Sequence, residues 1–289
     1  MRRILFVLFS AAALVLPAFA QEQVPEAYPA GTVRIRLLDG TTLVGMLTSE
    51  TDTTLVLLSE SGVQTTIPRA QVSSLVSMDG KRFFRVDPNR SRLLFGPTGR
   101  ALSKGTGYVA DYELFMPFVG YGAGGGITLA GGISILPFAS GQFLYAAPKV
   151  TVYERDETSV AWGLLASTFV GEGIDDFPVF GLVYGVTTFG GSTAWLTTGL
   201  GFGFADGEFG KNPAFMIGAE VQFANSAKLV SENYFIVGIE DATVLSGGIR
   251  FFGDRLSTDL ALLVFPALVS EGNGWPFFPW LGFAYNFGD

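Results

Sequence analysis

The chain has 289 residues, of which 48% are hydrophobic and only 15% are charged, against a usual charged share of about 25%. Its formal net charge of −8 argues against a nucleic-acid partner. The absence of histidine and cysteine excludes Ser-His-Asp and Cys-His nucleophile systems, removes the commonest metal ligand and leaves no disulfide to stabilise the fold.

The first 20 residues have the pattern of a secretory signal peptide. Arg2 and Arg3 form a basic start, residues 4–16 form an apolar core, and the sequence AFA at 18–20 is a small-x-small cleavage site. The alternative is a retained membrane anchor, but the apolar core is short for a span. We expect cleavage after this site, followed by an extended lead over residues 21–31.

Residues 32–78 contain short runs in which apolar and polar residues alternate, as in β-strands. In TVRIRLLDG the apolar residues share one face, the arginines share the other, and Asp39-Gly40 supplies a tight hairpin turn. Four further runs follow, TTLVGMLTSE, TTLVLLSE, GVQTTIP and VSSLVSM. Five short strands in so few residues predict a small, strongly bent β-barrel.

Two features of this region carry a family resemblance. A long strand with a central glycine, Gly45, follows the Asp-Gly turn, and residues 52–57 read D-x-x-L-x-L. This order resembles the Sm-like (Lsm) fold, a small barrel of the SH3-like type. RNA-binding members carry an asparagine in the first motif and an Arg-Gly pair in the second, where this chain has Thr54 or Leu55 and then PRA at 68–70. The resemblance therefore implies the fold without RNA binding, and it leaves docking and purely structural roles open.

Residues 79–91, DGKRFFRVDPNRS, are the most charged interval of the chain. This composition, with its proline, predicts a linker between the small barrel and the rest of the chain. Its basic residues could contact anionic headgroups, and a solvated connector is the other interpretation. The basic cluster consists of Lys81, Arg82, Arg85, Arg90 and Arg92.

From residue 92 to the C-terminus, runs of about ten residues alternate between large apolar and small or polar side chains. In 127–136 the large residues share one face with no charge opposite them, and in 177–189 Phe180, Leu182, Tyr184 and Val186 form the bulky side. Large residues outside and small or polar ones inside are the arrangement of a transmembrane β-barrel, which must close because lipid offers no hydrogen-bond partner. We therefore predict an all-β chain with an antiparallel transmembrane barrel over residues 92–289.

Twelve candidate strands are expected in this barrel, within a range of 8–12. They lie near residues 92–97, 107–120, 127–136, 143–153, 158–170, 177–189, 193–205, 213–223, 228–238, 242–252, 257–266 and 277–287. Short connections, such as the glycine turn at 122–126, alternate with longer ones at 171–176, 206–212 and 269–275. In outer-membrane barrels the short turns are periplasmic, and an even strand number places both ends of the barrel there. Without the weak first strand and one neighbour the number would be ten.

The last run, at residues 277–287, carries an aromatic series on its outward face. It resembles the final strand of bacterial outer-membrane proteins, which implies recognition by the barrel-assembly machinery through Phe283, Tyr285 and Phe287. Two residues follow the last phenylalanine, which departs from that pattern. The stretch DPNRSRLLFGPTGRALSKGTGY is also similar to outer-membrane proteins of Bacteroidota-like bacteria. We expect the outer membrane of a Gram-negative (diderm) bacterium, with the small barrel in the periplasm.

Polar residues of the opposite parity are expected to face the lumen. They are Glu113, Lys149, Tyr153, Glu220, Gln222, Arg250 and Asp259, with Lys228 and Glu232 on a less regular strand. Charges within a membrane layer mark a polar path or a paired network. Arg250 and Asp259 flank the turn at 253–255 on adjacent strands and could form an interior ion pair. The four tryptophans are expected in interfacial girdles and wall packing.

Two functions fit these patterns. One is a passive channel or small-solute transporter, and the other is a non-conducting anchor or assembly protein that presents the small barrel to a periplasmic protein. An enzyme is disfavoured, because histidine is absent and no spacing brings carboxylates such as Glu113 and Glu220 together. No cofactor is expected, since the glycine-rich runs lack the Lys-Ser/Thr of a phosphate loop. The expected partners are outer-membrane lipid and the assembly machinery.

Overall fold

The computed structural model describes residues 31–78, 84–155, 157–171, 177–191, 193–239, 242–270 and 277–288. The chain divides into two compact units, with the boundary between Phe84 and Arg85. The expected signal peptide and most of the lead that follows it lie outside the described residues. No helix in the described part of the chain is long and apolar enough to cross a membrane.

The smaller unit is a five-stranded antiparallel sheet in the order β4-β3-β2-β1-β5. Its elements are β1 (Thr32–Leu37), β2 (Thr42–Glu50), β3 (Thr54–Leu58), β4 (Gln64–Pro68), the short 3-10 helix η2 (Arg69–Gln71) and β5 (Val72–Ser77). Alternate apolar residues form its core, which is centred on Ile35 and Leu55. The predicted Asp-Gly turn joins β1 to β2, where Gly40 has a φ of +90° and Asp39 Oδ1 accepts a 2.8 Å hydrogen bond from the Thr41 amide.

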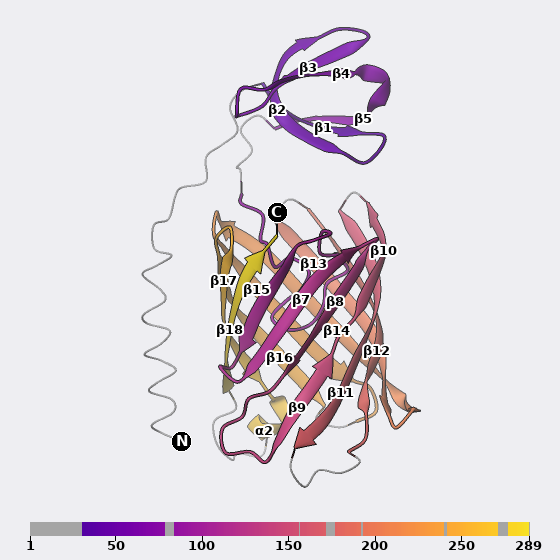
Figure 1. Cartoon of the computed structure of the whole chain (residues 1–289), viewed down its shortest axis with the longest axis vertical. Coiled ribbons are helices and arrows are strands. Elements are labelled where there is room, and N and C mark those ends of the chain that lie inside the picture. Colours follow the sequence, from indigo (N-terminus) through magenta and orange to yellow (C-terminus); the bar gives the residue numbers. More distant parts are fainter. Residues whose placement is uncertain are drawn as a thin grey trace. The chain divides into compact units, whose positions relative to one another are not determined.

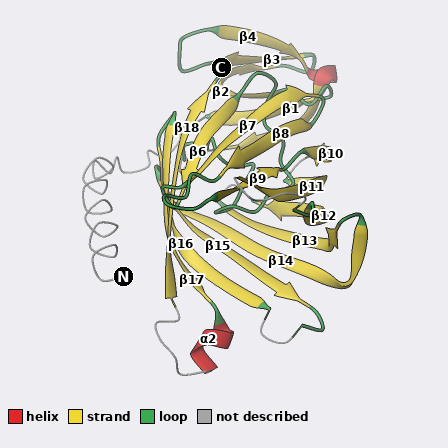
Figure 2. Cartoon of the chain, turned by 60° about the horizontal axis from the view of Figure 1, so that its bottom comes forward, coloured by secondary structure: helices red, strands yellow, loops and turns green. Residues whose placement is uncertain are grey.

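The larger unit is a closed antiparallel barrel (Figures 1 and 2). Its strands are β6 (Gly107–Tyr112), β7 (Met116–Gly124), β8 (Ile127–Ile133), β9 (Gly141–Ala146), β10 (Lys149–Arg155), β11 (Thr158–Gly171), β12 (Phe180–Gly190), β13 (Ala194–Ala205), β14 (Glu208–Ala224), β15 (Ala227–Ile236), β16 (Thr243–Phe252), β17 (Leu256–Val264) and β18 (Phe277–Phe287), with the one-turn helix α2 (Pro266–Ser270) before the last strand. Because β9 and β10 together occupy one position between β8 and β11, the barrel has twelve strands around its wall. Pairing of β18 with β6 closes it.

The predicted strand number is correct, but three of the predicted strands are not. The predicted strand at 143–153 is divided into β9 and β10 by residues 147–148, although the two share one position in the wall. Residues 92–97 do not join the wall; they turn back on themselves, with an isolated bridge between Arg92 and Pro97. The predicted strand at 107–120 is instead the hairpin of β6 and β7, reversed by a tight turn in which Glu113 and Leu114 have φ values of 56° and 64°. One strand was therefore lost and one gained.

The connections follow the predicted alternation with two exceptions, both at the end of the barrel where long loops are expected: the tight turn between β6 and β7 and the connection between β13 and β14. Three successive glycines with positive φ, Gly124 to Gly126, form the predicted tight turn between β7 and β8. The expected long loop at 206–212 is wrong, because β14 begins at Glu208 and only Asp206 and Gly207 reverse the chain. In this up-and-down order, the start of β6 and the end of β18 share one end of the barrel with the turns after β7, β10, β12, β14 and β16. We call it the turn end, and the opposite one the loop end.

Large apolar residues cover the outside of the wall, as the alternation predicts for most strands. Strand β12 is the exception, since the residues expected outside, including Tyr184 and Val186, are only 9% and 2% exposed, whereas Val183 and Phe189 lie outside. The inward residues pack with Leu93 and Leu94 in one buried cluster. An interior filled with protein accepts large apolar side chains, which a water-filled lumen would not. Trp195 and Trp280 likewise pack with interior residues, rather than in an outer girdle.

Candidate functional site in the barrel interior

The interior of the barrel is occupied by the segment that precedes its first strand, residues 85–106, which we call the plug. The plug enters at the turn end, where the Arg85 amide donates to Asn225 Oδ1 at 2.7 Å and Gln222 Nε2 donates to the Arg85 carbonyl at 2.9 Å. It leaves at the same end, where the Gly105 amide donates to the Gly122 carbonyl at 2.9 Å. Its middle is buried, and Arg92 is only 2% exposed. Residues 85–91 are therefore part of the barrel unit and not the solvated linker that their composition predicts.

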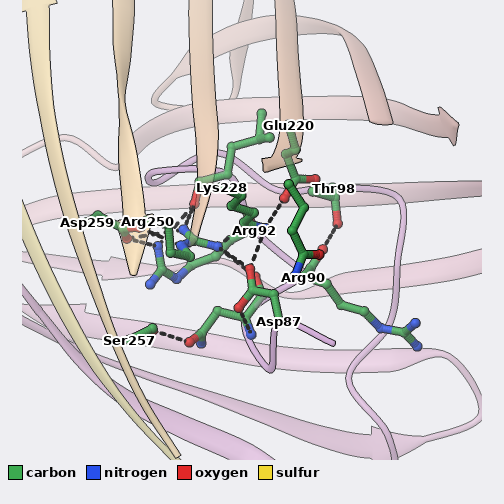
Figure 3. A network of polar contacts seen from close by, with 12 residues as sticks. Asp87, Arg90, Arg92, Thr98, Glu220, Lys228, Arg250, Ser257 and Asp259 are labelled. Carbon is green, nitrogen blue, oxygen red and sulfur yellow. Dashed lines mark hydrogen bonds and ion pairs between the residues drawn. The ribbon is translucent and has the colours of Figure 1, made fainter. Parts of the chain in front are cut away.

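A network of buried charges joins the plug to β16 and β17 (Figure 3). Arg250 and Asp259 are direct cross-strand neighbours, and the predicted ion pair is present, with Nε to Oδ1 at 2.5 Å and Nη2 to Oδ2 at 3.1 Å. The plug adds one charge of each sign. Arg92 Nη1 lies 2.7 Å from Asp259 Oδ2, and Asp87 Oδ2 lies 3.0 Å from Arg250 Nη1.

The same network continues onto β14 and β15. Lys228 forms ion pairs with both Asp87 and Glu220, and Arg100 Nη1 lies 3.3 Å from Glu220 Oε2. The guanidinium of Arg100 also stacks 4.9 Å from the centre of the Trp195 ring. Burial of Asp87 opposes its ionisation, but the positive charges of Lys228 and Arg250 outweigh that effect, so the pKa of this carboxyl is lowered.

Two further wall residues bind the plug outside this network. Lys149 Nζ donates to the carbonyls of Ser91, Thr98 and Arg100 at 3.1, 2.7 and 2.7 Å. The carboxylate of Glu232 accepts 3.0 Å hydrogen bonds from the amides of Phe95 and Gly96 and a 2.5 Å bond from the Tyr234 hydroxyl. Both charges are buried, and each is surrounded by groups of complementary polarity.

Most of the polar residues predicted to face the lumen are found in this interior. Those that are buried there are Lys149, Glu220, Gln222, Arg250 and Asp259. Tyr153 lies elsewhere: a bulge between Thr151 and Tyr153 reverses the parity of β10, so that this ring is 45% exposed and pairs with the outward Val160. Glu154 takes the inward position and lies 3.9 Å from Arg90.

Glu113 has no place in the network, because it lies in the tight turn between β6 and β7 at the loop end. Its Oε1 accepts a 2.6 Å hydrogen bond from the Leu281 amide, and its own amide donates to the Leu281 carbonyl. Glu220, by contrast, is neutralised by Lys228 and Arg100. The two carboxylates therefore have separate partners and do not form an acid-base pair.

The residues that sequence reasoning missed are those of the plug. Asp87 and Asn89 were placed in a linker, Arg92 in a wall strand and Arg100 in the connection after it, yet each is buried against the wall. Asn89 Oδ1, for example, accepts hydrogen bonds from Ser257 Oγ at 2.5 Å and Asn286 Nδ2 at 3.0 Å. A signal was available, because the predicted lumen charges needed partners and the densest unassigned charges lay directly before the first certain strand.

Between the plug and the loop end, the barrel encloses a cavity of about 480 Å³. Its floor is formed by plug residues, including Leu94 and Phe95, and its walls by apolar side chains and glycines of the strands, such as Leu182, Gly199 and Met216. Lining residues extend to Phe265, beyond the end of β17. The cavity falls within the size range of small-molecule sites, which are mostly apolar.

The described acidic side chains of this interior do not gather into a metal-binding group. In the described part of the chain, no group of three or more His, Cys, Asp or Glu side chains could hold a metal ion. The interior carboxylates are neutralised by cations or by several hydrogen-bond donors. Removing one member of such a buried pair would leave an uncompensated charge, so these carboxylates hold the plug and the wall in a fixed arrangement.

The aromatic series of the last strand lies on the outside of the barrel. Tyr285 is exposed, and Phe283 and Phe287 share its face of β18, where they pair with residues of β6. Their use as an assembly signal remains a prediction. It is compatible with this position, because the three residues lie on the outer face of the strand that pairs with β6 to close the barrel.

No protein-family model and no curated protein matches the chain. Among solved structures, it is similar to a KdgM porin in complex with disordered oligogalacturonate, at 8% identity and a TM-score of 0.47, over 64% of this chain and 99% of the porin. It is also similar to OmpTdeltaL8, a loop deletion mutant of an outer membrane protein of Vibrio cholerae, at 12% identity and a TM-score of 0.37, over 89% and 96%. A mutant of the Rh. blastica porin follows at 10% and 0.32, over 89% and 97%. These overlaps are too loose to assign a function, which has to come from the residues of this chain.

Proposed function

We propose that the chain is an outer-membrane transporter of small solutes, whose barrel is closed at rest by the plug. The membrane placement is supported by the wall itself, because large apolar side chains such as Trp162, Leu200 and Leu229 cover its outside while its charges lie inside. The backbone ring closes without a free strand edge, which a hydrocarbon solvent demands.

The observation that carries the proposal is the ionic attachment of the plug. Asp87, Arg92 and Arg100 bind four charged residues, one on each of the strands β14 to β17. The plug is therefore attached to the wall at several points across the interior. An open, passive pore would instead expose such charges to water along a continuous path. We therefore favour a transporter with a closed resting state over an open channel.

The direction of the chain supports a periplasmic position for the turn end. Short turns lie on that side in outer-membrane barrels, and the plug enters the barrel there at Arg85. The preceding small barrel, whose five strands suit the Sm-like resemblance, would then lie in the periplasm and could receive a protein partner. We propose no enzymatic activity, since the interior carboxylates are neutralised by fixed partners.

The test is electrical recording in planar bilayers with the whole chain and a plugless variant, in which residues 88–103 are replaced by a Gly-Ser segment of equal length. We expect no stable conductance steps from the unmodified chain and clear steps from the variant. A matched control replaces residues 134–139, in the connection between β8 and β9, and should remain silent. Stable steps from the unmodified chain would contradict closure by the plug.

A second candidate is a non-conducting anchor for the small barrel. The paired state of the network charges favours it, because a purely structural plug would be attached in the same way. If the plugless variant folds into bilayers and also stays silent, the barrel has no path to open and this candidate replaces transport.

A further inference from the structure

The cavity above the plug is apolar for a specific structural reason. Three successive inward positions of β13 are glycines, Gly199, Gly201 and Gly203, so this part of the wall has no side chains on its inner face. The first two of them line the cavity. Ala130 and Ala214, on β8 and β14, also line it with small side chains. The space is therefore created by small residues in the wall, between larger ones such as Leu182 that make it apolar.

The charged residues at the edge of this cavity are bound to the plug or the wall and do not point freely into the cavity. Lys149 is surrounded by three carbonyls of the plug, and Glu232 accepts from two amides and one hydroxyl. Arg92 is paired with Asp259 through Nη1 alone, and its Nε and Nη2 have no hydrogen-bond partner among the described residues. Both of these nitrogens are buried away from the cavity surface, and the guanidinium lies 5.5 Å from the centre of the Tyr112 ring and 5.8 Å from that of Tyr108. A charged ligand would have to displace these contacts or reach the buried nitrogens of Arg92 from an apolar space, so its desolvation would be poorly compensated.

We infer that this cavity binds an uncharged, largely apolar small molecule. The inference rests on the proposed function, because it names the class of solute that the interior accepts. The volume of about 480 Å³ is enough for an alkyl chain of roughly a dozen carbons or a compact ring system. Apolar contacts with Leu182, Met216 and Phe118 would supply most of the affinity. The plug would close one end of the cavity and so limit how deeply the molecule can enter.

The glycines of β13 provide a variant and its control on one strand. A Cβ at Gly199 would lie 3.4 Å from the nearest side-chain atoms, those of Met216, so Gly199→Leu can be accommodated and projects into the cavity. A Cβ at Gly203 would lie 3.7 Å from its nearest neighbour, and this residue faces inward beyond the cavity lining. Gly203→Leu is therefore the same chemical change outside the site.

The experiment is native mass spectrometry of the whole chain in phospholipid nanodiscs, with dodecan-1-ol and dodecanoate as probes of equal length and different charge. We expect a one-to-one complex with dodecan-1-ol and at least about tenfold less with dodecanoate. Gly199→Leu should reduce the dodecan-1-ol complex about tenfold, because its side chain occupies the space of several buried carbons, and Gly203→Leu should not.

Several outcomes would overturn the inference. One is a more abundant complex with dodecanoate than with dodecan-1-ol. Another is the same amount of dodecan-1-ol complex from the unmodified chain and from a folded Gly199→Leu variant, and the third is no complex with dodecan-1-ol at all. If Gly199→Leu does not fold, Ala214→Leu fills the same cavity from β14 and is measured instead. If dodecan-1-ol does not bind but the plugless variant conducts, the proposed transporter stands and only the apolar class of its solute is wrong. If dodecan-1-ol binds but the plugless variant does not conduct, the apolar binding site stands and the transport function is wrong.

Discussion

At the scale of single residues, the charges of the interior form one connected network, in which most are stabilised by a partner of opposite sign. The pair of Arg250 and Asp259 could be predicted because both residues flank one short turn at matching parity. The contribution of Asp87 could not, since no local rule connects a residue before the barrel with strands more than a hundred positions later. Long-range ion pairs depend on tertiary placement, which sequence periodicity does not encode.

Asp87 is the residue whose loss we expect to weaken the plug most. Asp87→Asn keeps the shape but removes the charge that Lys228 and Arg250 share, and breaking a buried pair in this way costs about 3–5 kcal/mol. The measurement is urea unfolding of the barrel in lipid vesicles. Asp254→Asn is the matched control, because Asp254 is 85% exposed in its ion pair with Arg85 and should change stability by less than about 1 kcal/mol. Equal effects of the two changes would argue against an energetic role for the network.

Close backbone contact makes a second prediction about the plug. At Gly99 a Cβ would collide with the carbonyl of Ser159, a backbone atom that cannot move aside, so Gly99→Ala should push the plug from β11. We expect a lower midpoint in heat-modifiability gels, in which folded barrels migrate faster. Gly203→Ala, which meets nothing closer than 3.7 Å, should leave the midpoint unchanged. An unaltered midpoint for Gly99→Ala would mean that the plug is only loosely packed here.

At the scale of strands, alternation predicts the wall well and the interior poorly. The period of two located nearly all the strands, because large apolar residues recur on the outward face of almost every one. It gave the wrong parity for Tyr184 and Val186, since a filled interior also accepts large apolar residues and the two faces of β12 then look alike. It also placed residues 92–97 in the wall, because a buried plug and a short strand share the same apolar composition.

The seam between β15 and β16 is the element where we expect the wall to be weakest. Ladder pairing is interrupted between Val230 and Tyr234, and side chains take over. Asn233 Oδ1 accepts from the Ser246 amide at 3.0 Å, and Asn233 Nδ2 donates to the Ile217 carbonyl at 3.1 Å. Asn233→Leu removes both bonds and should destabilise the barrel by about 1–3 kcal/mol, because the Ser246 amide loses its side-chain acceptor at a place where the ladder is interrupted.

Urea unfolding in vesicles measures this change as well. The matched control is Asn212→Leu, the same substitution at an exposed position near the loop end of β14, which should be nearly neutral. If Asn233→Leu unfolds at the same urea concentration as the unmodified chain, the seam is held by contacts other than these side-chain bonds.

At the scale of the whole molecule, the assignment depends on which solvent surrounds the barrel. Hydrocarbon outside explains both the apolar exterior and the buried charges, whereas water outside would leave many exposed side chains such as Leu129, Leu262 and Phe215 without a reason. The tryptophans separate the two sides of the wall, because Trp162 is 58% exposed on β11 and Trp195 stacks on Arg100 inside.

Quenching of tryptophan fluorescence by brominated phospholipid tests this division directly. In vesicles of such lipid, Trp162 should be strongly quenched because its ring contacts acyl chains near the middle of the wall, where its cross-strand neighbours are Val150 and Gly185. Trp162→Phe should therefore lower the lipid-dependent quenching, whereas Trp195→Phe, the same change on the inner face, should retain it. Quenching that disappears with Trp195→Phe and survives Trp162→Phe would mean that the outer face of the wall does not contact lipid. The apolar exterior would then have to be covered by a protein partner instead of a membrane.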